Sequence, residues 1–238
     1  MAGAEAKTRP AIAGLRLIAV VAALAPAPAA AGAWVAPEDG QEIVTNAVGE
    51  RNETLVYESS TYWEMPFESG DTSVVLTPWV ETNSDTWDGW RGEGTIGAKH
   101  VFYRDDETVV ALQASALWIS HPNGGCSEGG AEVRFLGGRS IGETGFVNVE
   151  AAARALSGGC EGGRLDISAG YRPYKNWLAL GQVYFDAPVD GDDTVRAQLS
   201  LVRFDDEGSG VQLGIRARID GGAPEPTLVL AFWGRPGD

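Results

Sequence analysis

The chain has 238 residues, a formal net charge of −15 at pH 7 and a hydrophobic fraction of 44%. Its length fits a single domain, and so acidic a chain would repel the phosphates of a nucleic acid, which argues against nucleic-acid binding. The 32 glycines and 12 prolines predict many tight turns rather than long helices.

Residues 1–33 have the pattern of a cleavable signal peptide. Basic residues come first, an apolar run follows at residues 17–25, and small residues precede Trp34. The alternative is a transmembrane anchor, but the apolar run is far shorter than the roughly 20 residues that a spanning helix needs. We therefore expect an exported protein with one mature domain over residues 34–238.

The mature chain consists of segments in which polar and apolar residues alternate with the period of two that a β-strand imposes. Pro78 interrupts one of them, and because proline cannot donate to a strand ladder we expect a bulge or a sheet edge there. We expect twelve strands, or ten if the first two are misassigned, near residues 43–49, 54–67, 72–82, 90–103, 110–118, 131–135, 148–155, 163–185 (a hairpin of two strands), 195–201, 211–219 and 227–233.

Repeated segments with one charged and one apolar face are typical of a transmembrane β-barrel, which has lipid outside and a polar lumen inside. The predicted fold class is therefore all-β, an antiparallel up-and-down transmembrane barrel. The alternative is a secreted soluble sandwich, or a soluble barrel that binds an apolar ligand, with the apolar face inward. Alternation alone does not distinguish these folds.

Connection lengths and aromatic residues favour the membrane barrel. The short turns RDDE, PYKN and DDEGS alternate with longer connections, as periplasmic turns and extracellular loops do, and only GGRSIGET departs from this order. Aromatic residues gather at strand ends, as in the two girdles that mark membrane interfaces. The outer girdle is predicted at Trp87, Trp90 and Trp118, and the inner one at Phe102, Tyr103, Tyr171, Tyr174 and Trp177.

The charged faces of the predicted strands would line the lumen. One interpretation is a pore whose arginines attract anions, and the other is a network of ion pairs that fills and seals a narrow lumen. The predicted lumen-facing residues are Arg91, Glu93, Lys99, Glu132, Arg134, Glu150, Arg154, Arg164, Asp166, Arg172, Arg196, Arg216 and Arg218.

Cys126 and Cys160 fall in two connections on the same predicted rim, and an exported protein with an even number of cysteines favours a disulfide between them. A metal site is the alternative, but no histidine or second cysteine pair accompanies them. His100 is expected on the outer face of a strand and His121 at the start of a loop, and neither belongs to a hydrolase motif. We therefore expect no enzyme activity, no catalytic residue, no metal and no cofactor.

Four stretches resemble a group of small, uncharacterised, transporter-like outer-membrane β-barrel proteins of Proteobacteria. They are GAW at residues 32–34, WRGEGTIGAK at 90–99, GYRPYKNWLALGQ at 170–182 and EPTLVLAFW at 225–233. The resemblance implies export, and assembly into the outer membrane of a Gram-negative bacterium by the barrel assembly machinery. It implies no particular substrate.

The functional hypothesis from the sequence is an outer-membrane barrel that acts as a narrow passive pore or as a structural membrane protein. Its expected partners are outer-membrane lipid, the barrel assembly machinery, and small solutes if the lumen is open. We expect a monomer.

Overall fold

The structure is a computed structural model that describes residues 36–51, 53–84, 90–120, 128–156, 161–189, 192–221 and 225–236. No helix among these residues is long and apolar enough to cross a membrane. The strands are β1 (Gln41–Arg51), β2 (Thr54–Pro66), β3 (Thr72–Leu76), β4 (Trp79–Asn83), β5 (Arg91–Arg104), β6 (Thr108–Ser120), β7 (Gly129–Ile141), β8 (Gly145–Leu156), β9 (Gly162–Tyr174), β10 (Trp177–Pro188), β11 (Thr194–Phe204), β12 (Gly210–Arg218) and β13 (Thr227–Gly234).

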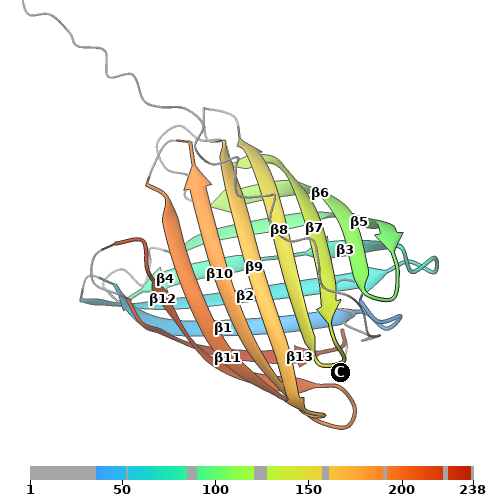
Figure 1. Cartoon of the computed structure of the whole chain (residues 1–238). Helices are drawn as coiled ribbons and strands as arrows, with labels where there is room; N and C mark the ends of the chain where they lie inside the picture. The colour runs from blue at the N-terminus through green and yellow to red at the C-terminus, as the bar shows by residue number, and fades with distance from the viewer. Residues whose placement is uncertain are drawn as a thin grey trace, which may run out of the picture.

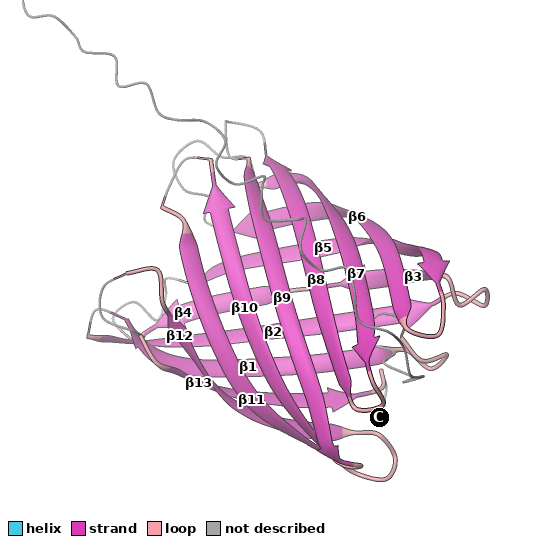
Figure 2. Cartoon of the chain, viewed as in Figure 1, coloured by secondary structure: helices cyan, strands magenta, loops and turns pink. Residues whose placement is uncertain are grey.

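These strands form one antiparallel sheet that closes on itself. Neighbours along the sheet follow chain order from β5 to β13, and β1 pairs with both β13 and β2. Figure 1 and Figure 2 show the resulting barrel, whose near and far walls cross because the strands are steeply tilted. The closed antiparallel barrel predicted from the sequence is confirmed.

The two short strands β3 and β4 are halves of one barrel strand, so the barrel has the predicted twelve strands. Both halves lie between β2 and β5 and pair with them in one continuous register: Glu64 opposes Val75, and Ser60 opposes Trp79. The predicted bulge or sheet edge at Pro78 is therefore wrong. The carbonyl of Pro78 accepts a hydrogen bond from the amide of Thr61. Proline has no amide hydrogen, so it cannot donate a hydrogen bond to the carbonyl of Thr61. One ladder hydrogen bond is therefore missing, while the register of the strand is unchanged.

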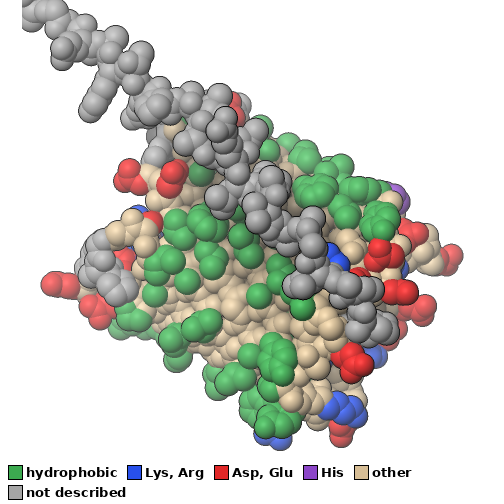
Figure 3. Space-filling view, in the orientation of Figure 1, with side chains coloured by type: hydrophobic (Ala, Val, Ile, Leu, Met, Phe, Trp, Pro, Cys, Tyr) green, Lys and Arg blue, Asp and Glu red, His purple; other side chains and the backbone are tan. Residues whose placement is uncertain are grey.

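The two faces of the wall differ as the period of two predicts. On β11 the outward Leu199 is 67% exposed, and on β12 the outward Ile215 is 62% exposed, whereas the inward Val202 and Val229 are fully buried. Figure 3 shows hydrophobic side chains over the near wall and charged ones mainly at its ends. A soluble barrel or sandwich would bury this apolar face, so the arrangement of the faces is that of a membrane barrel.

Connections are short at the end of the barrel where β1 begins and β13 ends, which is the end of the described termini. This end carries the turns after β2, β5, β7, β9 and β11, and the turn between β7 and β8 is only residues 142–144. The GGRSIGET stretch at residues 137–144 therefore does not depart from the order of short and long connections, because its first five residues belong to β7 and only the last three form the turn. At the opposite end β1 and β2 meet in a tight turn, in which Glu53 has a φ of 66°.

The predicted aromatic girdles are exposed on the outer surface. Trp90 and Trp118, at the end opposite to the termini, are 45% and 48% exposed. Phe102, Tyr171 and Tyr174, at the end with the short turns, are 56–74% exposed in the same way. Tyr103 and Trp177 are also exposed at that end, and Trp87 lies outside the described residues.

Candidate functional site

Charged side chains on the inner faces of β5, β7, β8, β9 and β10 form one continuous set of ion pairs, which we call the β5–β10 network. Glu93 of β5 is its centre: Nη1 of Arg164 lies 3.0 Å from its Oε1, and Nη1 of Arg154 donates to its Oε2 at 3.1 Å. Its members are Glu93, Glu132, Arg134, Glu150, Arg154, Arg164, Asp166 and Asp186.

Arg134 of β7 connects the remaining acids of this network. Its Nη1 lies 2.8 Å from Oε2 of Glu150 and 3.5 Å from Oδ2 of Asp166, and its Nη2 lies 3.1 Å from Oε1 of Glu132. Arg154 also donates from Nε to Glu132 at 3.0 Å. The planar guanidinium, with five donors, suits this bridging of several carboxylates.

The β5–β10 network crosses the interior of the barrel. Arg164 is on β9 and Glu93 on β5, with β6, β7 and β8 between them along the wall. Side chains on strands so far apart can meet only through the interior. The network therefore links separate parts of the wall rather than neighbouring strands alone.

A second set of ion pairs, the β1–β12 network, lies on the inner face of the other side of the wall. Arg51 of β1 lies 3.2 Å from Glu81 of β4 and 3.8 Å from Glu58 of β2. Nη2 of Arg216 on β12 lies 2.5 Å from Oε2 of Glu58, although β13 and β1 separate these strands. Its members are Arg51, Glu58, Glu81, Arg91, Arg216 and Glu225.

The third charged group is the Lys99 cluster, on the inner faces of β5, β2 and β3. Nζ of Lys99 lies 2.5 Å from Oε1 of Glu64, and both side chains are 2% exposed. The Ser73 hydroxyl donates to the same oxygen at 2.6 Å, and the Tyr62 hydroxyl donates to the other one. A buried ion pair is tolerated only with such additional hydrogen bonds, since desolvation of two charges is costly.

Uncharged side chains fill the space around these networks. Gln198 donates to Gln182 at 3.0 Å, and the Trp233 indole donates to Gln212 at 2.9 Å. A side chain that lined a water-filled channel would be exposed, but these inner-face residues are buried: Val75, Ala111, Gln113, Leu136, Asn148, Leu178, Gln198, Val202, Gln212 and Val229. Along much of its length the interior is therefore filled by the protein itself.

The structure brings most of the predicted lumen-facing residues into these networks, but not Arg172, Arg196 or Arg218. Arg172 lies over the ring of Phe204 at 5.2 Å, and Arg218 pairs with Asp220 at 2.6 Å. In the part of the chain that the structure describes, no ion pair is recorded for Arg196. That the predicted residues line a passage for solutes stays a prediction.

The sequence prediction missed several acids of the networks, namely Glu58, Glu64, Glu81, Asp186 and Glu225. Glu58 and Glu64 lie in β2, where every second residue from Thr54 to Glu64 faces inward. The alternation of polar and apolar residues was hard to recognise in this strand, because tyrosine, serine and threonine occur on both of its faces. These acids balance the arginines, so the interior does not have the cationic excess that the anion-attracting interpretation assumed.

The remaining chemical candidates form no site among the described residues. Nδ1 of His100 lies 2.9 Å from the Thr72 hydroxyl on the outer surface, and no carboxylate that would orient the imidazole is recorded beside it. No group of three potential metal ligands is found in the described ranges. Cys126, Cys160 and His121 lie outside these ranges, so the disulfide stays a prediction.

No family model matches this chain, and no curated protein matches it. Solved structures do match in fold. The NanC porin superposes with a TM-score of 0.62 at 7% identity, over 80% of this chain and 98% of the porin. The KdgM porin superposes with a TM-score of 0.58 at 8% identity, over 80% of this chain and 97% of the porin.

A third match is the COG4313 outer membrane channel from Pseudomonas putida F1, with a TM-score of 0.59 at 8% identity, over 83% of this chain and 95% of the channel. At such low identity the likeness concerns the fold alone. The chain therefore has the fold of outer-membrane porins and channels, a closed antiparallel barrel of twelve strands.

Proposed function

We propose that this protein is an outer-membrane barrel that acts as a narrow passive pore, with the β5–β10 network as its constriction. The observation that carries the proposal is the pairing of Arg164 and Arg154 with Glu93 across the interior. The surrounding inner-face side chains are buried, which leaves little room for solutes other than water and small ions. If the network closes the interior completely, the same barrel is a structural membrane protein that conducts no solute.

The charge of the interior argues for weak ion selectivity. Pores gain selectivity from rings of one sign of charge, but here each network pairs arginine or lysine with acids. We therefore expect that neither anions nor cations are strongly preferred. The KdgM porin has been solved in a complex with disordered oligogalacturonate, but the balanced interior gives no reason to assign an acidic sugar to this chain.

The location and partners of the protein follow from the same proposal. The signal peptide at residues 1–33 directs export, and the barrel assembly machinery of a Gram-negative cell inserts the barrel into the outer membrane. No enzymatic role is proposed, since the exposed pair of His100 and Thr72 has no third group to orient it in the described ranges of the chain.

Planar-bilayer recording on the purified protein tests the proposal. The wild type is expected to give small conductance steps or none. In Arg164→Ala the bridge from β9 is removed while Arg154 still neutralises Glu93, so conductance should rise several-fold. Arg218→Ala is the matched control, because it removes an arginine that pairs with Asp220 and is 38% exposed; its conductance should equal that of the wild type.

Heat-modifiable migration on a gel verifies that each variant is folded before recording. Large steps in the wild type would overturn the constriction, and so would an Arg164→Ala variant that is folded but conducts no better than Arg218→Ala.

A further inference from the structure

The outward face of the barrel is apolar at mid-strand from β5 to β13. Each of these strands presents leucine, isoleucine, valine, phenylalanine, alanine or glycine there, as lipid contact requires. Examples from six strands are Leu112, Val133, Ala151, Ile167, Leu199 and Leu213.

The exception is a patch on β1 and β2, which we call the polar patch and define as Asn46, Ser59 and Thr61. Asn46 is exposed at the middle of β1 and lies directly opposite Ser59 of β2, and Thr61 follows two residues further on the same face. Leu230 and Val80 flank the pair in register. The patch is therefore an isolated group of polar side chains on a lipid-facing surface.

The polar patch has unused hydrogen-bonding capacity. Among the described residues no hydrogen bond is recorded to the side chains of Asn46, Ser59 or Thr61, and the buried hydroxyl of the neighbouring Thr82 has no partner. The carbonyl of Thr61 also receives no ladder bond from Pro78. Hydrocarbon offers no hydrogen bond to any of these groups, and each one left unpaired there is costly.

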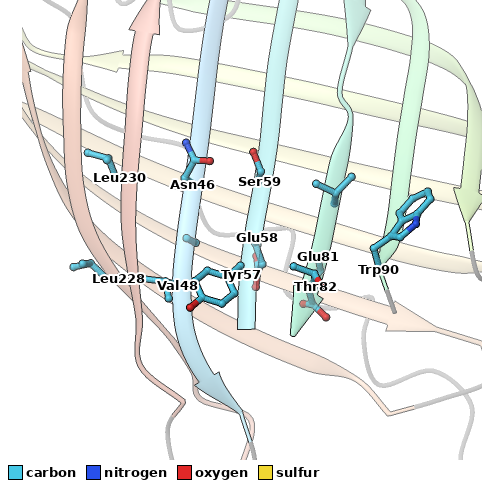
Figure 4. A pocket seen from close by; sticks show the side chains of 12 residues that line it. Asn46, Val48, Tyr57, Glu58, Ser59, Glu81, Thr82, Trp90, Leu228 and Leu230 are labelled. Atoms are coloured by element: carbon cyan, nitrogen blue, oxygen red, sulfur yellow. The ribbon is translucent and has the colours of Figure 1, made fainter. Parts of the chain in front are cut away.

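A groove of about 630 Å³ lies over the same strands. In Figure 4 Asn46 and Ser59 project from adjacent strands, with the Tyr57 ring next to Val48 further along these strands, Trp90 to one side, and Leu228 and Leu230 to the other. The polar side chains therefore lie between apolar flanks, with no hydrogen-bond partner among the described residues.

We propose that a second copy of this chain packs against this face, so that two barrels meet through their polar patches in the membrane. An amide and a hydroxyl each donate and accept, so the patch is complementary to itself, as a two-fold interface requires. Lipid tails fill a groove but cannot bond an amide, whereas polar side chains join transmembrane segments in this way. The monomer expected from the sequence stays a prediction, and the dimer is the alternative to it.

The charges at the ends of β1 are compatible with the dimer. Glu42 and Glu50 face outward at the two ends of the strand, beyond the polar patch, where water and salt screen their repulsion. The apolar residues between them would form the rest of the contact.

Photo-crosslinking in cells tests the proposal independently of any conductance. A photo-reactive amino acid replaces Leu230, which flanks the patch, or Ala151 on β8, which is outward on a different part of the wall. Position 230 is expected to give a product of twice the mass that contains only this chain, and position 151 is expected to give none. A product with lipid or another protein alone, or equal yields from both positions, would overturn the proposal.

Sedimentation equilibrium in density-matched detergent measures the strength of the contact. Removal of the polar groups from both copies by Asn46→Leu with Ser59→Ala should weaken the dimer by roughly tenfold or more. Ala151→Leu is the matched control, because it also places a leucine toward lipid, and its dimer fraction should equal that of the wild type. An unchanged dimer in the double variant, verified as folded by heat-modifiable migration, would contradict the polar patch as the interface.

Discussion

At the scale of single residues, Glu93 holds the interior together. Its carboxylate receives two hydrogen bonds from Arg164, at 3.0 and 3.3 Å, and two from Arg154. The Arg154 side chain is 8% exposed, so its charge depends on nearby carboxylates rather than on water. Loss of this one carboxylate would leave two arginines without their shared partner.

Glu93→Gln should lower the free energy of unfolding by about 2–4 kcal/mol, less than for a fully buried pair because Arg164 is partly exposed. Denaturant unfolding in detergent micelles measures the change. Asp39→Asn is the control: Asp39 pairs with Arg235 at an exposed site, and its loss should have little effect. Equal stability of both variants would show that the network contributes little.

Asp105, in the turn between β5 and β6, offers a test of local electrostatics. The Tyr103 hydroxyl donates to Oδ2 at 2.5 Å, the amides of Glu107 and Thr108 donate to Oδ1, and together these bonds lower the pKa of the Asp105 carboxyl. Because the folded turn prefers the carboxylate, its contribution to stability is present above the unfolded pKa and is lost as pH falls through the folded pKa.

Tyr103→Phe removes the donor with the largest influence, so the pKa of Asp105 should rise toward that of an ordinary aspartate. A carbon-13 NMR titration of the Asp105 carboxyl in wild type and variant measures this shift. An identical titration in both proteins would exclude the hydroxyl as the cause.

Individual ion pairs were beyond prediction from the sequence. The alternation places Glu93 and Arg164 on the inner face of their strands, but they are 71 positions apart, and their contact depends on how the barrel closes. Cross-strand neighbours such as Arg134 and Glu150 depend on register as well. The kind of residue inside could therefore be predicted, and its partner could not.

At the scale of elements, the period of two was sufficient to locate every barrel strand, because each one separates lipid from a polar interior. The predicted ends of the strands were less accurate, because residues near a turn can continue the hydrogen-bond ladder between two strands. For example, β1 runs from Gln41 to Arg51, whereas the expected strand was 43–49. The continuity across Pro78 could not be predicted, because a missing donor and a bulge look alike in sequence.

The close approach of β5 and β6 depends on Gly97. A Cβ at this position would lie 2.3 Å from the backbone oxygen of Ala114 and 2.7 Å from the Cα of Ser115. Gly97→Ala should therefore destabilise the barrel by about 1–3 kcal/mol, as overpacking does, measured by denaturant unfolding in micelles.

Gly181→Ala provides the comparison for this change. A Cβ at Gly181 would make only ordinary contacts, the nearest at 3.7 Å from a Leu199 methyl group, and alanine is favoured over glycine in a strand. This variant should be as stable as the wild type or more so. If Gly97→Ala behaved in the same way, the two strands would have to be further apart than the structure has them.

At the scale of the whole molecule, closure connects all of these features. Because β1 pairs with β13, no edge of the described sheet is left unpaired, and the interior becomes a separate space in which charged side chains from different strands meet. The same closure turns the apolar face of each strand outward. A continuous apolar face that includes Leu199 and Ile215 is far larger than the exposed patches of soluble monomers, as contact with lipid explains.

Residence in the outer membrane is therefore expected, and fractionation of expressing cells measures it. The protein should sediment with the outer membrane, require detergent for extraction, and migrate differently on a gel before and after heating because the closed barrel resists unfolding. Recovery of the folded protein in the soluble fraction without detergent would exclude a membrane barrel.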